Sequence, residues 1–184
     1  YTEEIDYWRA RLFSRILIVL VPFGFLAYLA GFIMAVIGKI PIVAIGDTIG
    51  YGLILFVFFN KHLRLSSKKN IVLICFYGLA FLLLIFIGSQ GPGLLFLLAA
   101  SVFSVLLFSS KTGYYSILIN FILYCSLLLG FLTDIPGIPF FNDYRAGSWI
   151  AIGASFLLIN LFIVYSVASL INGLQKTISN EKNL

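Results

Sequence analysis

The stretch LFSRILIVLVPFGFLAYLAGFIMAVI, residues 12–37, decides the fold class of this protein. Arg15 is its only charged side chain, and a transmembrane helix needs about 20 consecutive, predominantly apolar residues. The run is too long for the apolar part of a secretory signal peptide, which spans roughly 7–15 residues. The stretch therefore predicts a helix that crosses a membrane.

The composition of the whole chain agrees with this prediction. Hydrophobic residues make up 61% of the 184 residues, only 10% are charged, and the mean hydropathy is +1.09. A soluble domain of this composition would need a largely apolar surface, so the composition excludes that class. We expect an all-α, polytopic membrane protein. Because Met34 is the only methionine, we also expect the sequence to be a segment of a longer chain.

Six apolar runs separated by polar residues predict a bundle of six transmembrane helices. The fourth run is the shortest, and a re-entrant segment there would give an odd number of spans. Residues 1–11 form the expected lead-in, 12–171 the six-helix transmembrane domain and 172–184 the start of a cytoplasmic linker helix. The predicted spans are 12–37, 42–59, 71–88, 93–108, 114–132 and 147–171.

The distribution of lysine and arginine predicts the orientation. With the N-terminus inside, ten of these cations lie on the inner side, and only Lys39 and Arg145 lie outside. Cytoplasmic loops carry such an excess, so we expect both termini to be cytoplasmic. The net charge of +5 suits anionic lipid headgroups. Membrane lipids are therefore the expected partners, and nucleic acid is not.

Small residues recur at a spacing of four in the first two predicted spans. Ala27, Gly31 and Ala35 share one helix face, and Gly46 and Gly50 share another. Such faces let two helix backbones approach closely in a membrane. Because the connection between the two spans is very short, we expect these two faces to meet.

Asp47 is the only acidic residue within a predicted span. A carboxylate costs about 2.5–3.5 kcal/mol at the centre of a membrane helix. Two interpretations stay open: a hydrated carboxylate near the outer edge, and the polar anchor of a ligand pocket open to the outer side. An ion pair with Arg145 is compatible with the predicted topology. The candidate ligand-binding residues are Asp47, Tyr51, Tyr28, Gln90, Tyr124, Trp149, Asn160 and Arg145.

Several of these residues could instead have purely structural roles. Asn160, like Asn120, lies within a span and would equally serve an interhelical hydrogen bond. Trp149 fits the belt of aromatic residues at the membrane–water interface. The sequence alone does not separate these roles from ligand binding.

The sequence predicts no catalytic chemistry in this segment. His62 is the only histidine, and Cys75 and Cys125 sit in apolar runs without a metal-binding pattern. We expect no catalytic residues, no metal and no cofactor. A catalytic module, if the longer chain has one, would follow residue 184.

The last residues change character from apolar to polar. Ile171, Leu174 and Ile178 follow one another at spacings of three and four, the start of a coiled-coil seam, although Glu181 occupies its next position. A helix of this kind would pass a movement of the last span to a downstream module. It also predicts a homodimer formed through the C-terminal helix.

Five stretches taken together resemble a known family. They are EEIDYWRARLFSRIL (3–17), IGDTIGYG (45–52), NKHLRLSSKKN (60–70), GPGLLFLLAASVFSVLLFSSKTG (91–113) and NLFIVYSVASLINGLQKTISNEK (160–182). The chain resembles the multipass N-terminal sensor domain of bacterial sensor histidine kinases, of the type linked to PAS modules. The resemblance implies that the membrane domain senses a stimulus and that an attached kinase autophosphorylates. Related membrane domains also precede diguanylate cyclases, so the output stays open.

Together with the predicted helices, the resemblance implies a transmembrane sensory domain of a two-component system in the inner membrane of a bacterium. It would detect a small molecule, a lipid or a membrane property through an outer-side pocket and signal through its last helix. Two other classes stay open. A small transporter or channel would need a polar path across the bilayer. A scaffold subunit would need partners in a larger membrane complex.

Overall fold

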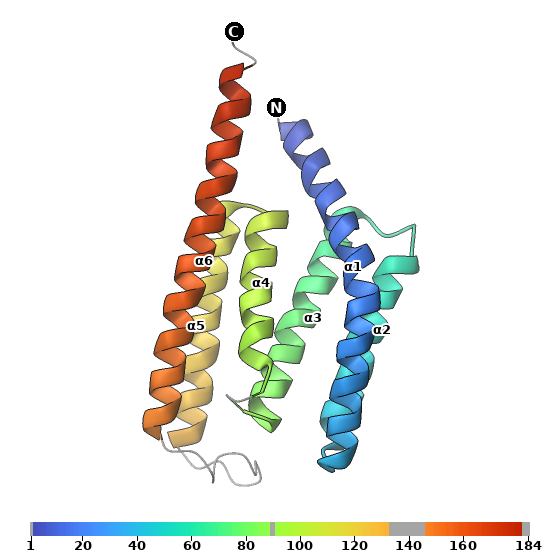
Figure 1. The fold of residues 1–184 in the computed structure, drawn as a ribbon, viewed down its shortest axis with the longest axis vertical. Coiled ribbons are helices and arrows are strands. Elements are labelled where there is room, and N and C mark those ends of the chain that lie inside the picture. The colour runs from blue at the N-terminus through green and yellow to red at the C-terminus, as the bar shows by residue number, and fades with distance from the viewer. Residues whose placement is uncertain (1, 89–90, 133–145, 182–184) are drawn as a thin grey trace. The chain divides into compact units, whose positions relative to one another are not determined.

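A computed structural model describes residues 2–88, 91–132 and 146–181, and these residues form helices joined by short connections (Figure 1). The prediction of an all-helical protein is confirmed for this part of the chain, in which no strand occurs. The helices are α1 (Thr2–Ile37), α2 (Pro41–Phe59), α3 (Leu65–Phe86), α4 (Gly93–Leu107), α5 (Ser110–Leu132) and α6 (Ala146–Glu181).

Within the described residues, five helices are long and apolar enough to cross a membrane, which shows a multi-pass membrane protein. The exception is α4, whose 15 residues span about 22 Å at 1.5 Å per residue. The hydrocarbon core of a bilayer is about 30 Å thick. A sixth full span at α4 and the cytoplasmic position of the termini therefore stay predictions.

Several helices extend beyond the apolar runs that predicted them. α3 begins at Leu65 rather than at residue 71, and α5 begins at Ser110 rather than at residue 114. The apolar run marks where lipid surrounds a helix, whereas the helical hydrogen bonds continue among polar residues. α3 ends at Phe86, two residues early, because Gly88 adopts a φ of 84° and its N–H bonds back to the Leu83 carbonyl.

The chain divides into two compact units, and the division falls within α4 after Leu97. Unit 1 contains α1, α2, α3 and the first residues of α4. Unit 2 contains the rest of α4 together with α5 and α6.

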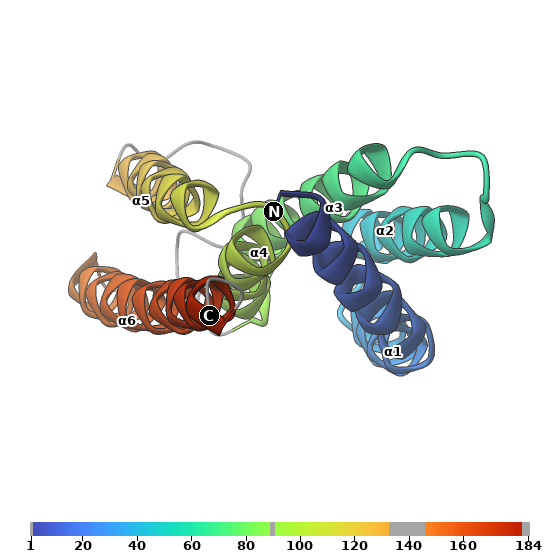
Figure 2. The ribbon, with the colours of Figure 1, turned by 90° about the horizontal axis from the view of Figure 1, so that it is seen from above.

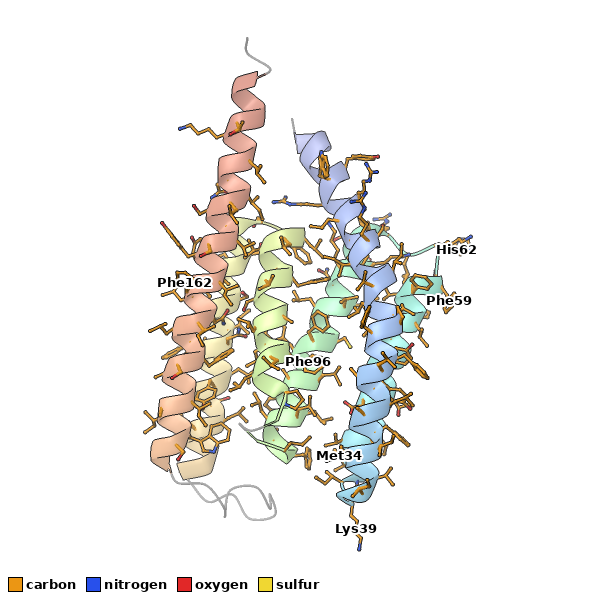
Figure 3. All side chains as sticks on the ribbon, in the orientation of Figure 1. Met34, Lys39, Phe59, His62, Phe96 and Phe162 are labelled. Carbon is orange, nitrogen blue, oxygen red and sulfur yellow. The ribbon has the colours of Figure 1, made fainter. Side chains whose placement is uncertain are left out.

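In unit 1, a tight turn joins α1 to α2. The N–H of Ile40 donates to the Ala35 carbonyl at 2.9 Å, and Lys39 lies at the turn with a φ of 55°. Pro41 starts α2, where a missing N–H costs no hydrogen bond. Figure 3 shows Lys39 at this end of α2 and Phe59 and His62 at the other end. The buried core beside the turn consists of Ala35, Val43, Ala44 and Leu83.

The small residues of α1 and α2 do not all meet as predicted. Gly31 of α1 does face α2, but Gly46 and Gly50 of α2 face α3 instead. A Cβ added at Gly50 would lie 2.9 Å from a methyl carbon of Leu79, and one at Gly46 would collide with Leu82. The prediction was wrong for these two glycines because α2 contacts both α1 and α3 and needs a separate face for each.

In unit 2, α5 and α6 run antiparallel and side by side, as Figures 1 and 2 both show. Ser110 at the start of α5 bonds to Asn172 late in α6 at 3.0 Å. Further along α5, Gly113 lies against Val164 of α6, and the Tyr124 ring packs onto Gly153 of α6. These contacts fix the register of the two helices.

Gly153 and Gly147 of α6 provide a matched test of this packing. A Cβ at Gly153 would collide with the Tyr124 ring, whereas one at Gly147 would meet no atom of the described residues within 4 Å. We expect Gly153→Ala to lower the free energy of unfolding by about 1–3 kcal/mol through overpacking. Gly147→Ala should leave it unchanged or raise it, because alanine favours helix. Unfolding of both variants in detergent measures the difference, and equal stabilities would contradict the packing described here.

Candidate functional site

Asp47 is the seventh residue of α2, about 9 Å from the start of that helix at 1.5 Å per residue. Its half-buried carboxylate lies directly over Gly31 of α1, where an added Cβ would be 2.6 Å from Oδ2. Among the residues that the structure describes, no hydrogen-bond donor or cation contacts this carboxylate. The glycine therefore provides the space for Asp47 between the two helices.

Two tyrosines lie next to Asp47 along the α1–α2 contact. The rings of Tyr28 and Tyr51 stack with centroids 5.3 Å apart and an angle of 9° between their planes. The Tyr28 hydroxyl shares a hydrogen bond of 3.3 Å with the hydroxyl of Thr48. The Tyr51 hydroxyl donates to the Val21 carbonyl, also at 3.3 Å. Two of the predicted site residues, Tyr28 and Tyr51, thus lie with Asp47 at the contact between α1 and α2.

Two phenylalanines extend this group along α1. The ring centroid of Phe25 is 5.8 Å from that of Tyr51, and the centroid of Phe32 is 5.8 Å from that of Tyr28. Phe25 is 43% exposed and Phe32 is 37% exposed, so the group reaches the surface of unit 1. We call it the α1–α2 strip; its members are Phe25, Tyr28, Gly31, Phe32, Asp47, Thr48 and Tyr51.

Sequence reasoning missed Thr48, Phe25 and Phe32. A signal for the phenylalanines was present, because residues 25, 28 and 32 follow at spacings of three and four and share one helix face. Thr48 gave no such signal. Its hydroxyl donates to the Ala44 carbonyl of its own helix at 2.7 Å, a bond that any threonine within a helix can make.

Tyr124 and Trp149 come together in unit 2, away from the strip residues in the chain. The Tyr124 hydroxyl donates to the Trp149 carbonyl at 2.7 Å, and the ring centroids lie 5.5 Å apart. Trp149 is only 1% exposed. Its placement in the interface belt was therefore wrong, because the indole packs inside unit 2 rather than among headgroups.

Unit 2 also contains a set of buried polar side chains. The Asn120 amide nitrogen donates to the Ser101 hydroxyl at 2.8 Å, so the predicted interhelical bond exists for Asn120. The amide of Asn160 is 0% exposed, and neither its oxygen nor its nitrogen has a hydrogen-bond partner. We call the set the polar layer; its members are Ser101, Ser104, Ser116, Asn120 and Asn160.

Gln90 and Arg145 lie outside the described residues, so the Asp47–Arg145 pair stays a prediction. The other six predicted residues fall into two groups. Asp47, Tyr28 and Tyr51 belong to unit 1, and Tyr124, Trp149 and Asn160 belong to unit 2. Their convergence in one pocket also stays a prediction.

Two grooves on the described part of the protein are lined by none of the predicted site residues. The first lies at the end of α2, and its lining includes Phe59, Lys61 and His62. The second lies between α5 and α6, where Tyr114 and Lys176 line it. In the described part of the chain, no group of three or more His, Cys, Asp or Glu side chains could hold a metal ion.

Comparison with known protein families identifies one whose model matches most of this chain. The family model of MASE11, a family of membrane-associated sensor domains, matches residues 7–174. The chain belongs to the MASE11 family. The match ends where the apolar part of α6 ends, at Leu174, whereas the helix continues to Glu181. The expectation of a membrane sensor domain is thereby confirmed, while the link to a histidine kinase stays a prediction. A search of the curated proteins and of the solved structures finds no match.

The contact between Gly31 and Asp47 can be tested with a double-mutant cycle. Gly31→Ala should destabilise this MASE11 domain by about 1–3 kcal/mol, because the new methyl group displaces the carboxylate. In an Asp47→Ala background the same change should cost nothing. The coupling energy from detergent unfolding measures this difference. Gly24→Ala is the control, since its Cβ would make only an ordinary 3.7 Å contact with Tyr51.

Asn160 and Asn120 form a second matched pair. Asn160→Leu should raise the free energy of unfolding by about 1–3 kcal/mol, because it removes a buried amide that lacks partners. Asn120→Leu should lower it, because the hydroxyl of Ser101 loses the amide bonded to it. The same unfolding assay compares them. A loss of stability in Asn160→Leu would show that this amide is satisfied in the folded protein.

Proposed function

We propose that this MASE11 domain is the sensory input domain of a bacterial sensor histidine kinase in the inner membrane, and that it binds a small molecule at the α1–α2 strip. The observation that carries the proposal is Asp47. A half-buried carboxylate within a membrane helix, with no partner among the described residues, costs free energy that a bound cation or N–H donor would recover.

The composition of the strip indicates the chemistry of its ligand. Asp47 offers a carboxylate, and Thr48 and Tyr28 offer hydroxyls that already share one hydrogen bond. The rings of Phe25 and Phe32 offer apolar faces that attract cations. A small molecule with an amine or amidine group on an apolar body fits all three features. A lipid or a change in the membrane itself is the other stimulus that such an exposed strip would detect.

The response would leave the domain through α6. This helix is continuous from Ala146 to Glu181, so that its polar end follows any rotation or shift of its apolar part. Ile171 and Leu174 begin a seam through which two copies would pair. An output module attached after this helix, a histidine kinase or a diguanylate cyclase, would then change its activity.

Asp47→Asn and Asp47→Ala test the binding role of the strip. In the full-length protein, both should abolish the response to the stimulus or weaken it at least tenfold, about 1.4 kcal/mol, since hydrogen bonds to a charged group contribute roughly 1.5–3 kcal/mol. Membrane levels should stay normal. Kinase autophosphorylation against stimulus concentration is the measurement. Ser155→Ala on α6, whose hydroxyl bonds only its own helix backbone, is the control. Normal signalling by both Asp47 variants would refute the proposal.

One observation favours a second function, that of a small transporter or channel. The polar layer of unit 2 places five polar side chains inside a membrane helix group, and polar residues there often mark a substrate path. Each of them is at most 2% exposed, which fits helix packing better than a water-filled path. Flux of ions or small solutes into proteoliposomes would distinguish the two functions.

A further inference from the structure

We propose that the groove between α5 and α6 binds the headgroup of an anionic phospholipid. The groove encloses about 390 Å³. Its lining is unusually polar for a membrane helix pair: two phenols, a hydroxyl, a carboxamide and an ammonium group. These residues are Tyr114, Tyr165, Ser169, Asn172, Gly173 and Lys176.

The groove lies at the depth of lipid headgroups. The apolar part of α6 ends at Leu174, and the α6 residues of the groove run from Tyr165 to Lys176 across that end. Tyr114 is the fifth residue of α5, at the corresponding end of its helix. Tyrosine is enriched at this depth because its ring is apolar and its hydroxyl is polar.

The charges around the groove favour an anion. Lys176 belongs to the lining, and Lys111 is exposed in the first turn of α5. In the described part of unit 2, Glu181 is the only acidic residue. A phosphate bound here would face the ammonium group of Lys176, and Lys111 adds a second positive charge at the same end of the helix pair; each lysine contributes about 1 kcal/mol near an anionic membrane surface.

Hydrogen-bond donors complete the site. The Asn172 carboxamide accepts a bond from the Ser110 hydroxyl at 3.0 Å through its oxygen, which leaves its amide hydrogens for an acceptor on the ligand. The hydroxyls of Tyr165, Tyr114 and Ser169 are further donors. The oxygens of a phosphodiester headgroup only accept hydrogen bonds, so the donors that line the groove could bind them.

A lipid fits the groove better than a soluble phosphate. Leu170 is 68% exposed and Leu174 is 63% exposed, and both neighbour groove residues on α6. Acyl chains would cover these leucines while the headgroup occupies the polar lining. Because the groove joins the start of α5 to the end of α6, a bound headgroup would hold the exit helix against its neighbour. This site goes beyond the proposed function, since it requires only that the domain lies in a membrane.

Lipid retention tests the site directly. The chain is purified in detergent, mixed with phosphatidylglycerol or phosphatidylcholine, and examined by native mass spectrometry for bound lipid. We expect preferential retention of phosphatidylglycerol. Lys111→Gln and Lys176→Gln should each weaken it about fivefold, the fold-change that roughly 1 kcal/mol per charge represents. Lys176→Arg should retain the lipid, because it keeps the charge.

Lys61→Gln is the matched control, because Lys61 lines the other groove, at the end of α2. It should change retention less than twofold. An equal loss in Lys61→Gln would show that general surface charge binds the lipid and would overturn the site. Equal retention of phosphatidylcholine would do the same, and so would displacement of the lipid by millimolar inorganic phosphate. None of these readouts depends on signalling, so failure here is distinct from failure of the Asp47 proposal.

Discussion

The structure depends on close approach of helices at glycine residues. In a bilayer, apolar side chains gain little by leaving lipid for protein, so helices associate where their surfaces fit closely. Several glycines of the described helices provide such places, and each accepts a larger side chain from a neighbouring helix. The pairs include Gly31 with Asp47, Gly46 with Leu82, Gly50 with Leu79, Gly93 with Leu84, Gly113 with Val105 and Gly153 with Tyr124. Among these partners only Asp47 is charged, which distinguishes the α1–α2 contact from the others.

The polar side chains within the helices follow two different patterns. In unit 2, the polar side chains of the polar layer are buried inside the protein, and the Asn120 amide donates to the Ser101 hydroxyl, as expected for a bond that holds two helices together. In unit 1, the Asp47 carboxylate lies near the surface, next to aromatic rings and hydroxyls. Helix packing explains the buried polar side chains of unit 2. It does not explain a carboxylate near the surface of unit 1, and this difference is the physical basis for assigning ligand binding to the α1–α2 strip.

The apolar runs predicted the helices well, because the length of a membrane helix follows from the thickness of the bilayer. They misplaced the starts of α3 and α5, since hydropathy reports the lipid boundary and not the first residue of the hydrogen-bonded helix. The partners of the glycines were harder to predict. Spacing of four identifies a face of a helix, but it does not say which neighbour occupies that face, and Gly46 and Gly50 turned out to face α3.

For the candidate site as well, sequence spacing predicted which residues share a helix face, but not which residues of other helices they contact. Asp47 and Tyr51 lie on one face because they are four residues apart, whereas the contact with Tyr28 depends on the register between α1 and α2. Trp149 was misjudged because a tryptophan near a helix end fits an interface and a core equally well by sequence. Its burial depends on Tyr124, which lies 25 residues away and bonds to its carbonyl. Local patterns thus identified the unusual residues, and tertiary contacts gave them their roles.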